Sequence, residues 1–517
     1  MNSIRHQTTC LALALLVLLS GCASIDFDYP RVESTAITDT EDTHLGVRVR
    51  ELSASRPDDD QSGFFVLRDG IEALTARLLL AKQAERSIDT QYFLIKTDDS
   101  SKAFIAALLG AADRGVRVRF LLDDAFTEGY DAGLAALESH PNIEIRIVNP
   151  FERGVGGRSW RAFTNLSRIS RRMHAKTFTV DGQITILGGR NIADEYFGAR
   201  EDAKFGDLDV AGIGPISAEV SAMFDSYWNH PTALPVPAFA RMPDDPEAEL
   251  LDLRDRLATW HKGVVDSEYA EAVQATVLAF MDSDKATFEW APYQLVYDSP
   301  DKGVSRVTGP GDIKVPLAQA LQSAERELVV LTPYFVPQKT GIEFFSELES
   351  RGVEVTIVTN SLAANNHAIV HSGYAPARKP LLRAGVRLFE VRPDADFLGY
   401  EVVAASDAKA TLHTKAFVVD REKSFIGSFN FDPRSAVYNT ESGVIIESES
   451  IGEQFGRTID AKLKEETYEL FLNEDGKLRW RGYRNGETTI YKKDPESSLG
   501  QRSAVGFARL LPIKGQL

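Results

Sequence analysis

The stretch HTKAFVVDREKSFIGSFNFD, residues 413–432, decides the fold, because it combines a β-hairpin pattern with an unusual set of polar residues. Two apolar runs, AFVV and SFIG, flank a short polar connection, which predicts two antiparallel strands joined by a tight turn. The polar residues His413, Lys415 and Asp420 interrupt this pattern with the spacing His-x-Lys-x4-Asp. Ser428 and Asn430 follow in the second strand and just beyond it. Packing alone gives no reason for these side chains, so the hairpin is a candidate for chemistry.

The same spacing occurs a second time, in residues 174–197, HAKTFTVDGQITILGGRNIADEYF. His174, Lys176 and Asp181 repeat the three polar positions, and Asn191 follows at the spacing that Asn430 has in the other copy. Composition alone rarely produces one such pattern, and two copies at matching places are far rarer. The chain therefore carries a duplicated polar hairpin.

The hairpin belongs to a longer internal repeat of alternating helices and strands. GIEALTARLLLAKQAERS and IDTQYFLI, residues 70–95, correspond to PLAQALQSAERELVVLTPYFVP, residues 316–337. RGVRVRFLL from Arg114 corresponds to RGVEVTIVT from Arg351. This alternation predicts an α/β fold with helices on the faces of each sheet, and the length of the repeat predicts two similar domains.

The composition along the chain suggests the limits of these domains. An acidic, polar segment precedes the first copy, and a proline-rich, irregular segment separates the two. We expect a signal peptide (1–21), an acidic tether (22–62), a first domain (63–230), a linker or insertion (231–300), a second domain (301–475) and a C-terminal tail (476–517).

The N-terminus resembles a bacterial lipoprotein signal. Arg5 precedes the apolar run CLALALLVLLSGC, which is too short to span a bilayer as a helix and ends at Cys22 in the sequence LSGC. Cleavage before Cys22 would discard Cys10, and acylation of Cys22 would anchor the protein by lipid. Ala23 favours a periplasm-facing position on the outer membrane, with the inner membrane as the alternative, and an ordinary signal peptide is the competing interpretation.

The net charge argues against one class of partner. The formal charge is −17 and the isoelectric point about 5.1. Proteins that bind a nucleic-acid backbone usually have more basic than acidic residues, because the phosphate charges must be neutralised. We therefore expect no nucleic-acid partner.

With these motifs the chain resembles the phospholipase D superfamily, whose mark is a pair of His-x-Lys-x4-Asp motifs, and within it the cardiolipin synthases. The likeness extends to GGRNIADEYFGA, DLDVAGIGP, VTNSLAANNHAIVHSGYA and GSFNFDPRSAVYNTESG. The resemblance implies two tandem α/β domains related by a pseudo-twofold axis, with one active site at their interface. It also implies phospholipid substrates, no metal or other cofactor, and a separately encoded accessory protein as a further partner.

The residue types fit catalysis of phosphodiester transfer. A neutral imidazole can attack phosphorus and form a phosphohistidine, which divides one difficult step into two. By resemblance His174 is the nucleophile and His413 the acid and base, while Lys176, Lys415, Asn191 and Asn430 surround the phosphate oxygens. Ser428 offers a hydroxyl to the phosphate, whereas its counterpart Gly189 does not.

Four carboxylates accompany these groups. Glu441 in NTESG matches the acid that orients the imidazole in the family, and Asp209 in FGDLDVAG is its counterpart, with Asp207 as the alternative. Ordinary strand-edge acids are the competing interpretation of these residues. Asp181 and Asp420 lie at an odd offset from the histidines, so we expect them to hold the hairpin rather than to act on substrate.

The resemblance implies synthesis of cardiolipin from two phospholipids, with phosphatidylethanolamine as donor and phosphatidylglycerol as acceptor. The alternative is hydrolysis of phospholipids to phosphatidic acid at the same site, because water can replace the acceptor alcohol. A nuclease of the same superfamily is the third interpretation, and the acidity of the chain and its lipid anchor speak against it.

The lipid anchor predicts the result of one substitution. Cys22→Ser should abolish acylation and release the protein from membranes or leave it uncleaved, because the acylated thiol is gone. Metabolic labelling with a fatty acid and membrane fractionation measure both effects. A processed Cys22→Ser protein that stays tightly bound to membranes would contradict the prediction.

Overall fold

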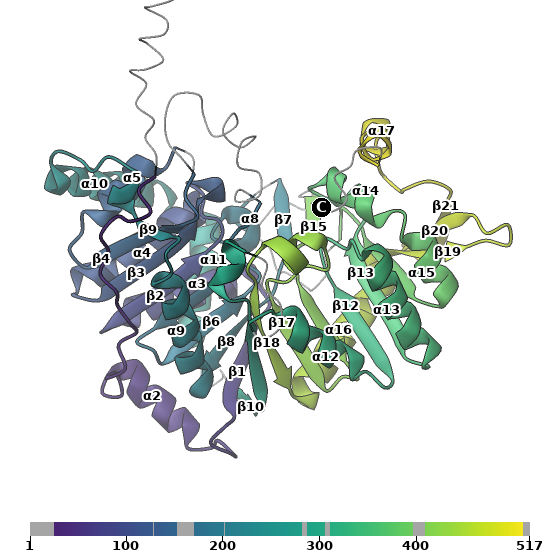
Figure 1. Ribbon diagram of the computed structural model, residues 1–517, viewed down its shortest axis with the longest axis horizontal. Helices are drawn as coiled ribbons and strands as arrows, with labels where there is room; N and C mark the ends of the chain where they lie inside the picture. The colour runs from purple at the N-terminus through teal and green to yellow at the C-terminus, as the bar shows by residue number, and fades with distance from the viewer. Residues whose placement is uncertain are drawn as a thin grey trace, which may run out of the picture.

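Two α/β domains lie side by side in the computed structural model, the first in purple to teal and the second in green to yellow (Figure 1). The structure describes residues 25–127, 129–151, 170–200, 202–281, 287–305, 311–395 and 409–509. The signal peptide and Cys22 lie outside the described residues. Within these ranges, no helix combines the length and the apolar character needed to cross a membrane.

Each domain is built on one mixed sheet. The first sheet has the order β10 (Glu289–Ala291), β1 (Ser62–Leu67), β8 (Asp209–Ile213), β6 (Ile184–Gly188), β5 (Thr177–Val180), β2 (Ser87–Tyr92), β3 (Arg117–Asp123), β4 (Ile143–Val148), β9 (Ala233–Pro235). The second has the order β11 (Tyr293–Tyr297), β18 (Ser442–Glu447), β17 (Lys423–Gly427), β16 (Ala416–Val419), β12 (Glu327–Leu331), β13 (Glu354–Asn360), β14 (Arg387–Val391), β19 (Thr467–Leu472), β20 (Leu478–Arg484), β21 (Glu487–Tyr491).

The two sheets, of nine and ten strands, share the same arrangement of six central strands. In both, three parallel strands (β2, β3 and β4; β12, β13 and β14) are followed on one side by an antiparallel hairpin (β5 and β6; β16 and β17). The hairpin is in turn paired with one further strand, β8 or β18. This agreement confirms the predicted α/β fold with two tandem domains.

Helices cover both faces of each sheet. Those on the outer faces are α3 (Gly70–Gln83), α4 (Asp99–Asp113) and α5 (Asp131–Glu138) in the first domain, and α12 (Lys314–Gln322), α13 (Gln338–Ser350) and α15 (Arg378–Ala384) in the second. Helices α9 (Pro215–Trp228) and α16 (Glu449–Glu466) contribute to a core that contains residues of both sheets. The two domains therefore share one continuous hydrophobic core.

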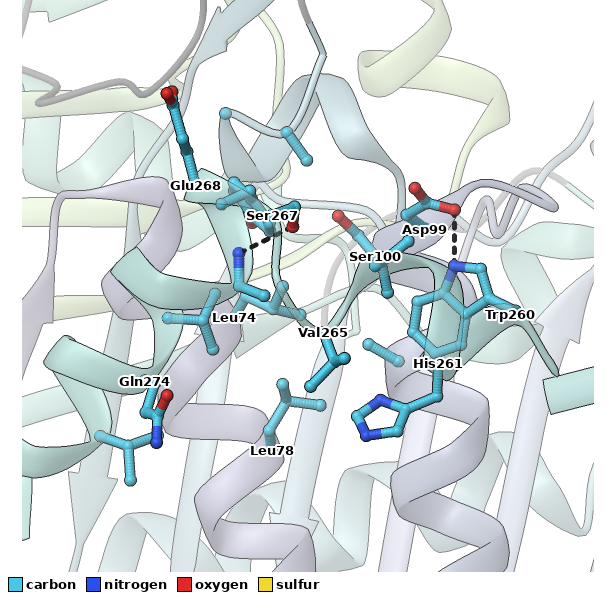
Figure 2. A pocket seen from close by; sticks show the side chains of 18 residues that line it. Leu74, Leu78, Asp99, Ser100, Trp260, His261, Val265, Ser267, Glu268 and Gln274 are labelled. Atoms are coloured by element: carbon cyan, nitrogen blue, oxygen red, sulfur yellow. Dashed lines mark hydrogen bonds between the residues drawn. The ribbon is translucent and has the colours of Figure 1, made fainter. Parts of the chain in front are cut away.

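The region between the domains is shorter than the sequence indicates. Strands β9 and β10 belong to the first sheet and β11 to the second. The true insertion is a pair of helices, α10 (Pro246–Val264) and α11 (Glu268–Met281), packed beside α3 and α5. A cavity lies beneath this pair (Figure 2).

Two terminal segments also differ from the expected boundaries. The predicted tether contains α2 (His44–Ser53), whose Leu45 and Val49 are buried, and the backbone oxygen of Ser34 accepts a hydrogen bond from Arg119. The predicted tail supplies β20, β21 and the helix α17 (Leu499–Ala508), and β20 pairs with β19. Both segments are polar in composition, and their few apolar residues are enough to attach them to the domains.

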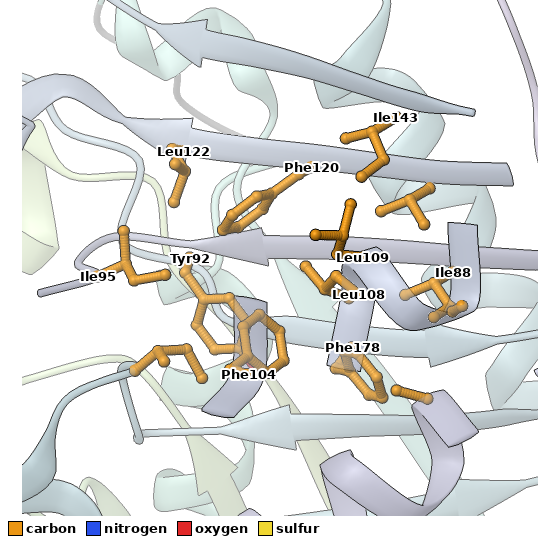
Figure 3. Close-up of a cluster of buried hydrophobic side chains, with 14 of the residues drawn as sticks. Ile88, Tyr92, Ile95, Phe104, Leu108, Leu109, Phe120, Leu122, Ile143 and Phe178 are labelled. Atoms are coloured by element: carbon orange, nitrogen blue, oxygen red, sulfur yellow. The ribbon is translucent and has the colours of Figure 1, made fainter. Parts of the chain in front are cut away.

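The core of the first domain lies against one face of the parallel strands. Phe104 from α4 packs between Tyr92, Phe120 and Phe178, which come from β2, β3 and β5 (Figure 3). All four side chains are fully buried. The opposite face of the same strands includes the buried Asp89 and Arg119, which form an ion pair (2.6 Å). One face of the parallel strands therefore carries the aromatic core, and the other carries buried charged residues.

The two aspartates of the motifs lie in the hairpin turns. Asp181 and Asp420 both adopt left-handed backbone, with φ of 50° and 52°. The Asp181 carboxylate accepts hydrogen bonds from the backbone N–H groups of Arg86 (2.8 Å) and Ser87 (2.9 Å). The Asp420 carboxylate accepts the equivalent bonds, from residues 325–327. Each aspartate thus ties its hairpin to the start of the neighbouring parallel strand.

We expect Asp181→Ala to lower the free energy of unfolding by about 2–4 kcal/mol, because buried N–H groups lose a charged acceptor. Asp181→Asn should lower the free energy of unfolding less, because asparagine keeps one acceptor oxygen and tolerates a left-handed backbone. Urea denaturation followed by circular dichroism measures both. Loss of activity in an Asp181→Ala protein of unchanged stability would contradict the structural role.

Candidate active site

A small parallel sheet between the domains brings the second motif to a carboxylate of the first domain. It consists of β7 (Ala203–Gly206) and β15 (Lys409–Leu412), with Leu412 opposite Gly206. The next residues along the two strands are His413 and Asp207. The backbone N–H of His413 donates to the backbone oxygen of Gly206 (2.7 Å). The imidazole Nδ1 of His413 lies 2.5 Å from Asp207 Oδ2.

The first motif meets the second domain in the same way. Met173 and Thr440 form an isolated parallel bridge. The backbone N–H of His174 donates to the backbone oxygen of Thr440 (2.8 Å). The next residue after Thr440 is Glu441, whose Oε2 lies 2.7 Å from His174 Nδ1. Each histidine therefore pairs with a carboxylate from the other domain, through a backbone pairing that is repeated in the two halves.

This pairing fixes the chemical state of the two imidazoles. A carboxylate accepts the proton of Nδ1, so the neutral ring carries its lone pair on Nε2. Both rings are buried, and burial lowers the pKa of His174 to about 4 and that of His413 to about 3. At neutral pH both imidazoles are neutral in the empty site, which is the form that a nucleophile requires.

Two buried lysines stand beside the histidines. Lys176 donates to the His174 backbone oxygen (2.5 Å), and Lys415 donates to that of His413 and lies 3.7 Å from Asp207. Burial lowers the pKa of Lys176 to about 7 and also lowers that of Lys415, whereas the nearby carboxylates raise both. An anion bound here would favour the charged ammonium groups.

The structure corrects the prediction for the carboxylate of the first domain. The sequence favours Asp209 as the partner of a histidine, but Asp209 is buried against Arg77 (2.8 Å) and Arg190 (3.5 Å). Asp207 makes the contact instead, because it immediately follows the strand that pairs with β15. Asp209 already belongs to β8 and serves the packing of α3 on the sheet.

Ser428 and Gly189 also differ from expectation. The Ser428 hydroxyl donates to Glu441 (2.5 Å) rather than facing an open space, and the Ser435 hydroxyl donates to the same carboxylate (2.6 Å). At Gly189 a Cβ atom would lie 2.0 Å from Asp207 Oδ1. The missing side chain therefore makes room for the shorter carboxylate of this half.

The motif asparagines have unpaired acceptors. The Oδ1 atoms of Asn191 and Asn430 are buried and have no hydrogen-bond partner, although buried polar atoms are normally paired. Asn191 Nδ2 lies 2.9 Å from the hydroxyl of Tyr196. Rotation of this amide would let Tyr196 donate to Oδ1 and turn the two N–H groups toward a ligand.

Aromatic rings that the sequence analysis does not single out enclose the histidines. Phe205 stacks on His413 with ring centres 5.3 Å apart, and Tyr196 meets it edge-on at 5.1 Å. Phe93 meets His174 edge-on at 4.9 Å. Tyr196 and Phe205 lie within the quoted stretches GGRNIADEYFGA and FGDLDVAG, which are signals that could have identified them.

Asp298 is another residue that sequence reasoning misses. Its carboxylate accepts hydrogen bonds from the buried Lys302 (2.8 Å) and from the Glu441 backbone N–H (2.9 Å). Burial raises the pKa of Asp298 to about 6. This pair fixes the backbone of Glu441, while Ser428 and Ser435 fix its side chain.

The Gly189–Asp207 contact predicts unequal effects for two small substitutions. Gly189→Ala should reduce phosphodiester turnover at least about 100-fold, because the new methyl group displaces Asp207 from His413. Ser428→Ala removes one hydrogen-bond donor from Glu441 without adding atoms, and it should reduce phosphodiester turnover about tenfold. Rates on purified proteins of matched folded fraction measure both. Full activity of Gly189→Ala would contradict the assignment of Asp207.

The chain is similar to known proteins over both domains. Residues 78–228 and 317–463 match the family model described as cardiolipin synthase, PLD-like domain. The chain is 38% identical over 477 residues to cardiolipin synthase C of Escherichia coli, covering 91% of this chain and 99% of that protein. It is 30% identical over 514 residues to an uncharacterized protein of Helicobacter pylori, covering 97% and 98%.

A solved structure supports the fold. The phosphatidylserine synthase of Haemophilus influenzae superposes with a TM-score of 0.56 at 12% identity, over 91% of this chain and 100% of that one. Together the matched model and the sequence relatives cover both domains and both motifs. The chain belongs to the cardiolipin synthase, PLD-like family, and it is an enzyme of the phosphatidyltransferase and phospholipase D type.

Proposed function

We propose that the protein joins two phospholipids into cardiolipin through a phosphohistidine intermediate, with phosphatidylethanolamine as donor and phosphatidylglycerol as acceptor. The observation that carries the proposal is the pair of buried, neutral histidines, each held at Nδ1 by a carboxylate of the other domain. The similarity to a cardiolipin synthase over nearly the whole chain supports cardiolipin as the product. The choice of donor and acceptor follows from the family resemblance.

In the first step His174 Nε2 attacks the phosphorus of the donor. The P–N bond forms, the P–O bond to the headgroup alcohol breaks, and His413 gives its proton to the leaving oxygen. His413 acquires this proton when the anionic phosphodiester binds, because a nearby negative charge favours the imidazolium form. The assignment of His174 as nucleophile follows from resemblance to other two-domain proteins of the superfamily.

In the second step His413 acts as a base. It takes the proton from a hydroxyl of the acceptor lipid, the resulting oxygen attacks phosphorus, and the P–N bond to His174 breaks. The product is cardiolipin and the free enzyme. If water takes the place of the acceptor, the same two steps release phosphatidic acid.

The lysines and asparagines stabilise the charge that develops on the phosphate oxygens. Lys176 and Lys415 supply two cations beside the two histidines, and Asn191 and Asn430 supply amide N–H groups. Two ammonium groups placed in this way can take the role that Mg²⁺ has in other phosphoryl transfers. The proposed mechanism therefore needs no metal ion.

The lipobox at Cys22 supports a site of action at the bacterial cell envelope. Acylation there would hold the active site close to its lipid substrates, facing the periplasm, at the outer membrane or the inner one. The family resemblance adds a separately encoded accessory protein as a partner.

Alanine variants of the two histidines should differ in whether they form the covalent phosphatidyl-enzyme. His413→Ala should still form a phosphatidyl-enzyme from a lipid with an activated leaving group, which needs no protonation. His174→Ala should form none. Acid quench of enzyme with donor lipid radiolabelled in its phosphatidyl part measures the covalent label. Label retained by His174→Ala and absent from His413→Ala would reverse the assignment.

The product distinguishes transfer from hydrolysis in the same assay. Labelled donor with excess acceptor lipid should give labelled cardiolipin, with phosphatidic acid as a minor product. Phosphatidic acid as the main product at saturating acceptor would contradict synthesis and favour a phospholipase D.

A further inference from the structure

A large cavity lies beneath the inserted helices, outside the catalytic pair. It has a volume of about 740 Å³ and is bounded by α3, α4, α10 and α11. Figure 2 shows Leu74, Leu78 and Val265 lying around the same space, with Glu268 at its edge. The mechanism described above uses none of these residues.

The lining of the cavity is largely apolar. Aliphatic side chains from α3, α10 and α11 supply most of it, namely Leu74, Leu78, Val264, Val273 and Val277. The polar group of Trp260 is already engaged, because its Nε1 donates to Asp99 (2.7 Å), as drawn in Figure 2. Exposed residues such as Ser267 and Glu268 also line the cavity. An apolar ligand would therefore displace water from the aliphatic part of the lining.

One short helix lies between the cavity and the catalytic site. Gly198 and Ala199, at the end of α8 (Asp194–Phe197), line the cavity. The Tyr269 hydroxyl from α11 donates to the Phe197 backbone oxygen (3.0 Å). One residue earlier, Tyr196 packs against His413 and contacts Asn191. Helix α8 is therefore shared by the cavity wall and the catalytic wall.

We propose that this cavity holds one acyl chain of a phospholipid substrate while its phosphate lies between the two histidines. The proposal rests on the proposed function, because it takes the substrate to be a phospholipid. The volume falls within the range of about 300–1,000 Å³ that is usual for ligand pockets. An acyl chain matches the lining, since it has no polar group to leave unpaired in the apolar part.

Helix α10 of the insertion makes few buried contacts with the rest of the first domain. None of the residues described in α10 is fully buried, although Leu250, Leu253 and Leu257 face the core. Val265, which follows α10 and lines the cavity, is 46% exposed, so the cavity is open to the surface beside the connection between α10 and α11. The bound chain would then fill the contacts that the helices themselves do not make.

Chain length tests the proposal by kinetics. With monomeric short-chain lipids, each added CH₂ group should lower the KM by up to about fourfold while the cavity fills. Ala270→Phe, which places a ring in the cavity, should flatten this dependence. Ala275→Phe on the exposed side of α11 is the matched control and should keep it. A dependence unchanged in Ala270→Phe would overturn the proposal.

Photocrosslinking tests the site without turnover. A phosphatidylglycerol and a phosphatidylethanolamine, each with a diazirine near the end of one acyl chain, should label α3 and α11, and the more strongly labelling lipid identifies which substrate uses the cavity. Ala103→Phe, from the opposite wall, provides a second blocking variant if Ala270→Phe fails to fold. Labelling confined to other surfaces in the wild-type protein would overturn the proposal.

These readouts separate the two proposals. If no phosphatidyl-enzyme forms in the wild type, the proposed mechanism fails, yet crosslinking in the cavity can still occur. If the phosphatidyl-enzyme forms and the cavity is neither labelled nor sensitive to chain length, the acyl-chain site fails and the mechanism stands.

Discussion

The pairing of each motif histidine with a carboxylate of the other domain is the interaction on which the site depends. His174 needs Glu441 from the second domain, and His413 needs Asp207 from the first. Neither domain alone can present an oriented imidazole, so the shared core and the two backbone pairings between domains are conditions for activity. Duplication of one domain followed by this reciprocal contact produces a single site with pseudo-twofold symmetry.

Charge explains why the site can be buried and still bind an anion. Two lysines are balanced by Asp207 and Glu441, and the histidines are neutral because burial lowers their pKa. Burial would raise the pKa of Glu441, but the neighbouring His174 and Lys176 and the Ser428 hydroxyl lower it to about 2. A bound phosphodiester adds one negative charge, which favours the charged forms of Lys176 and of the histidines. In the proposed mechanism, the proton that His413 gains in this way is the one that it gives to the leaving oxygen.

The sequence predicts the fold and the hairpins well, because periodicity and the repeat are local patterns, whereas Glu441 is named by resemblance to the family. Sequence reasoning fails where the outcome depends on contacts between distant segments. Asp207 and Asp209 are two residues apart and the sequence favours Asp209, but the pairing of β7 with β15 places Asp207 beside His413. The role of Ser428 is missed for the same reason, since its partner Glu441 comes from a different strand. Residues 34–53 look like a tether because their buried contacts are few.

The central claim is that one anion-binding site is formed jointly by both domains. A crystal structure with bound orthovanadate tests it most directly, because vanadate adopts the five-coordinate geometry of phosphoryl transfer. If both domains form the site, vanadium should lie between the Nε2 atoms of His174 and His413 and be bonded to one of them. Lys176 and Lys415 should contact its oxygens, and the contacts of the histidines with Glu441 and Asp207 should be retained. Vanadate held by the residues of one domain alone, or held through a divalent metal ion, would contradict the account.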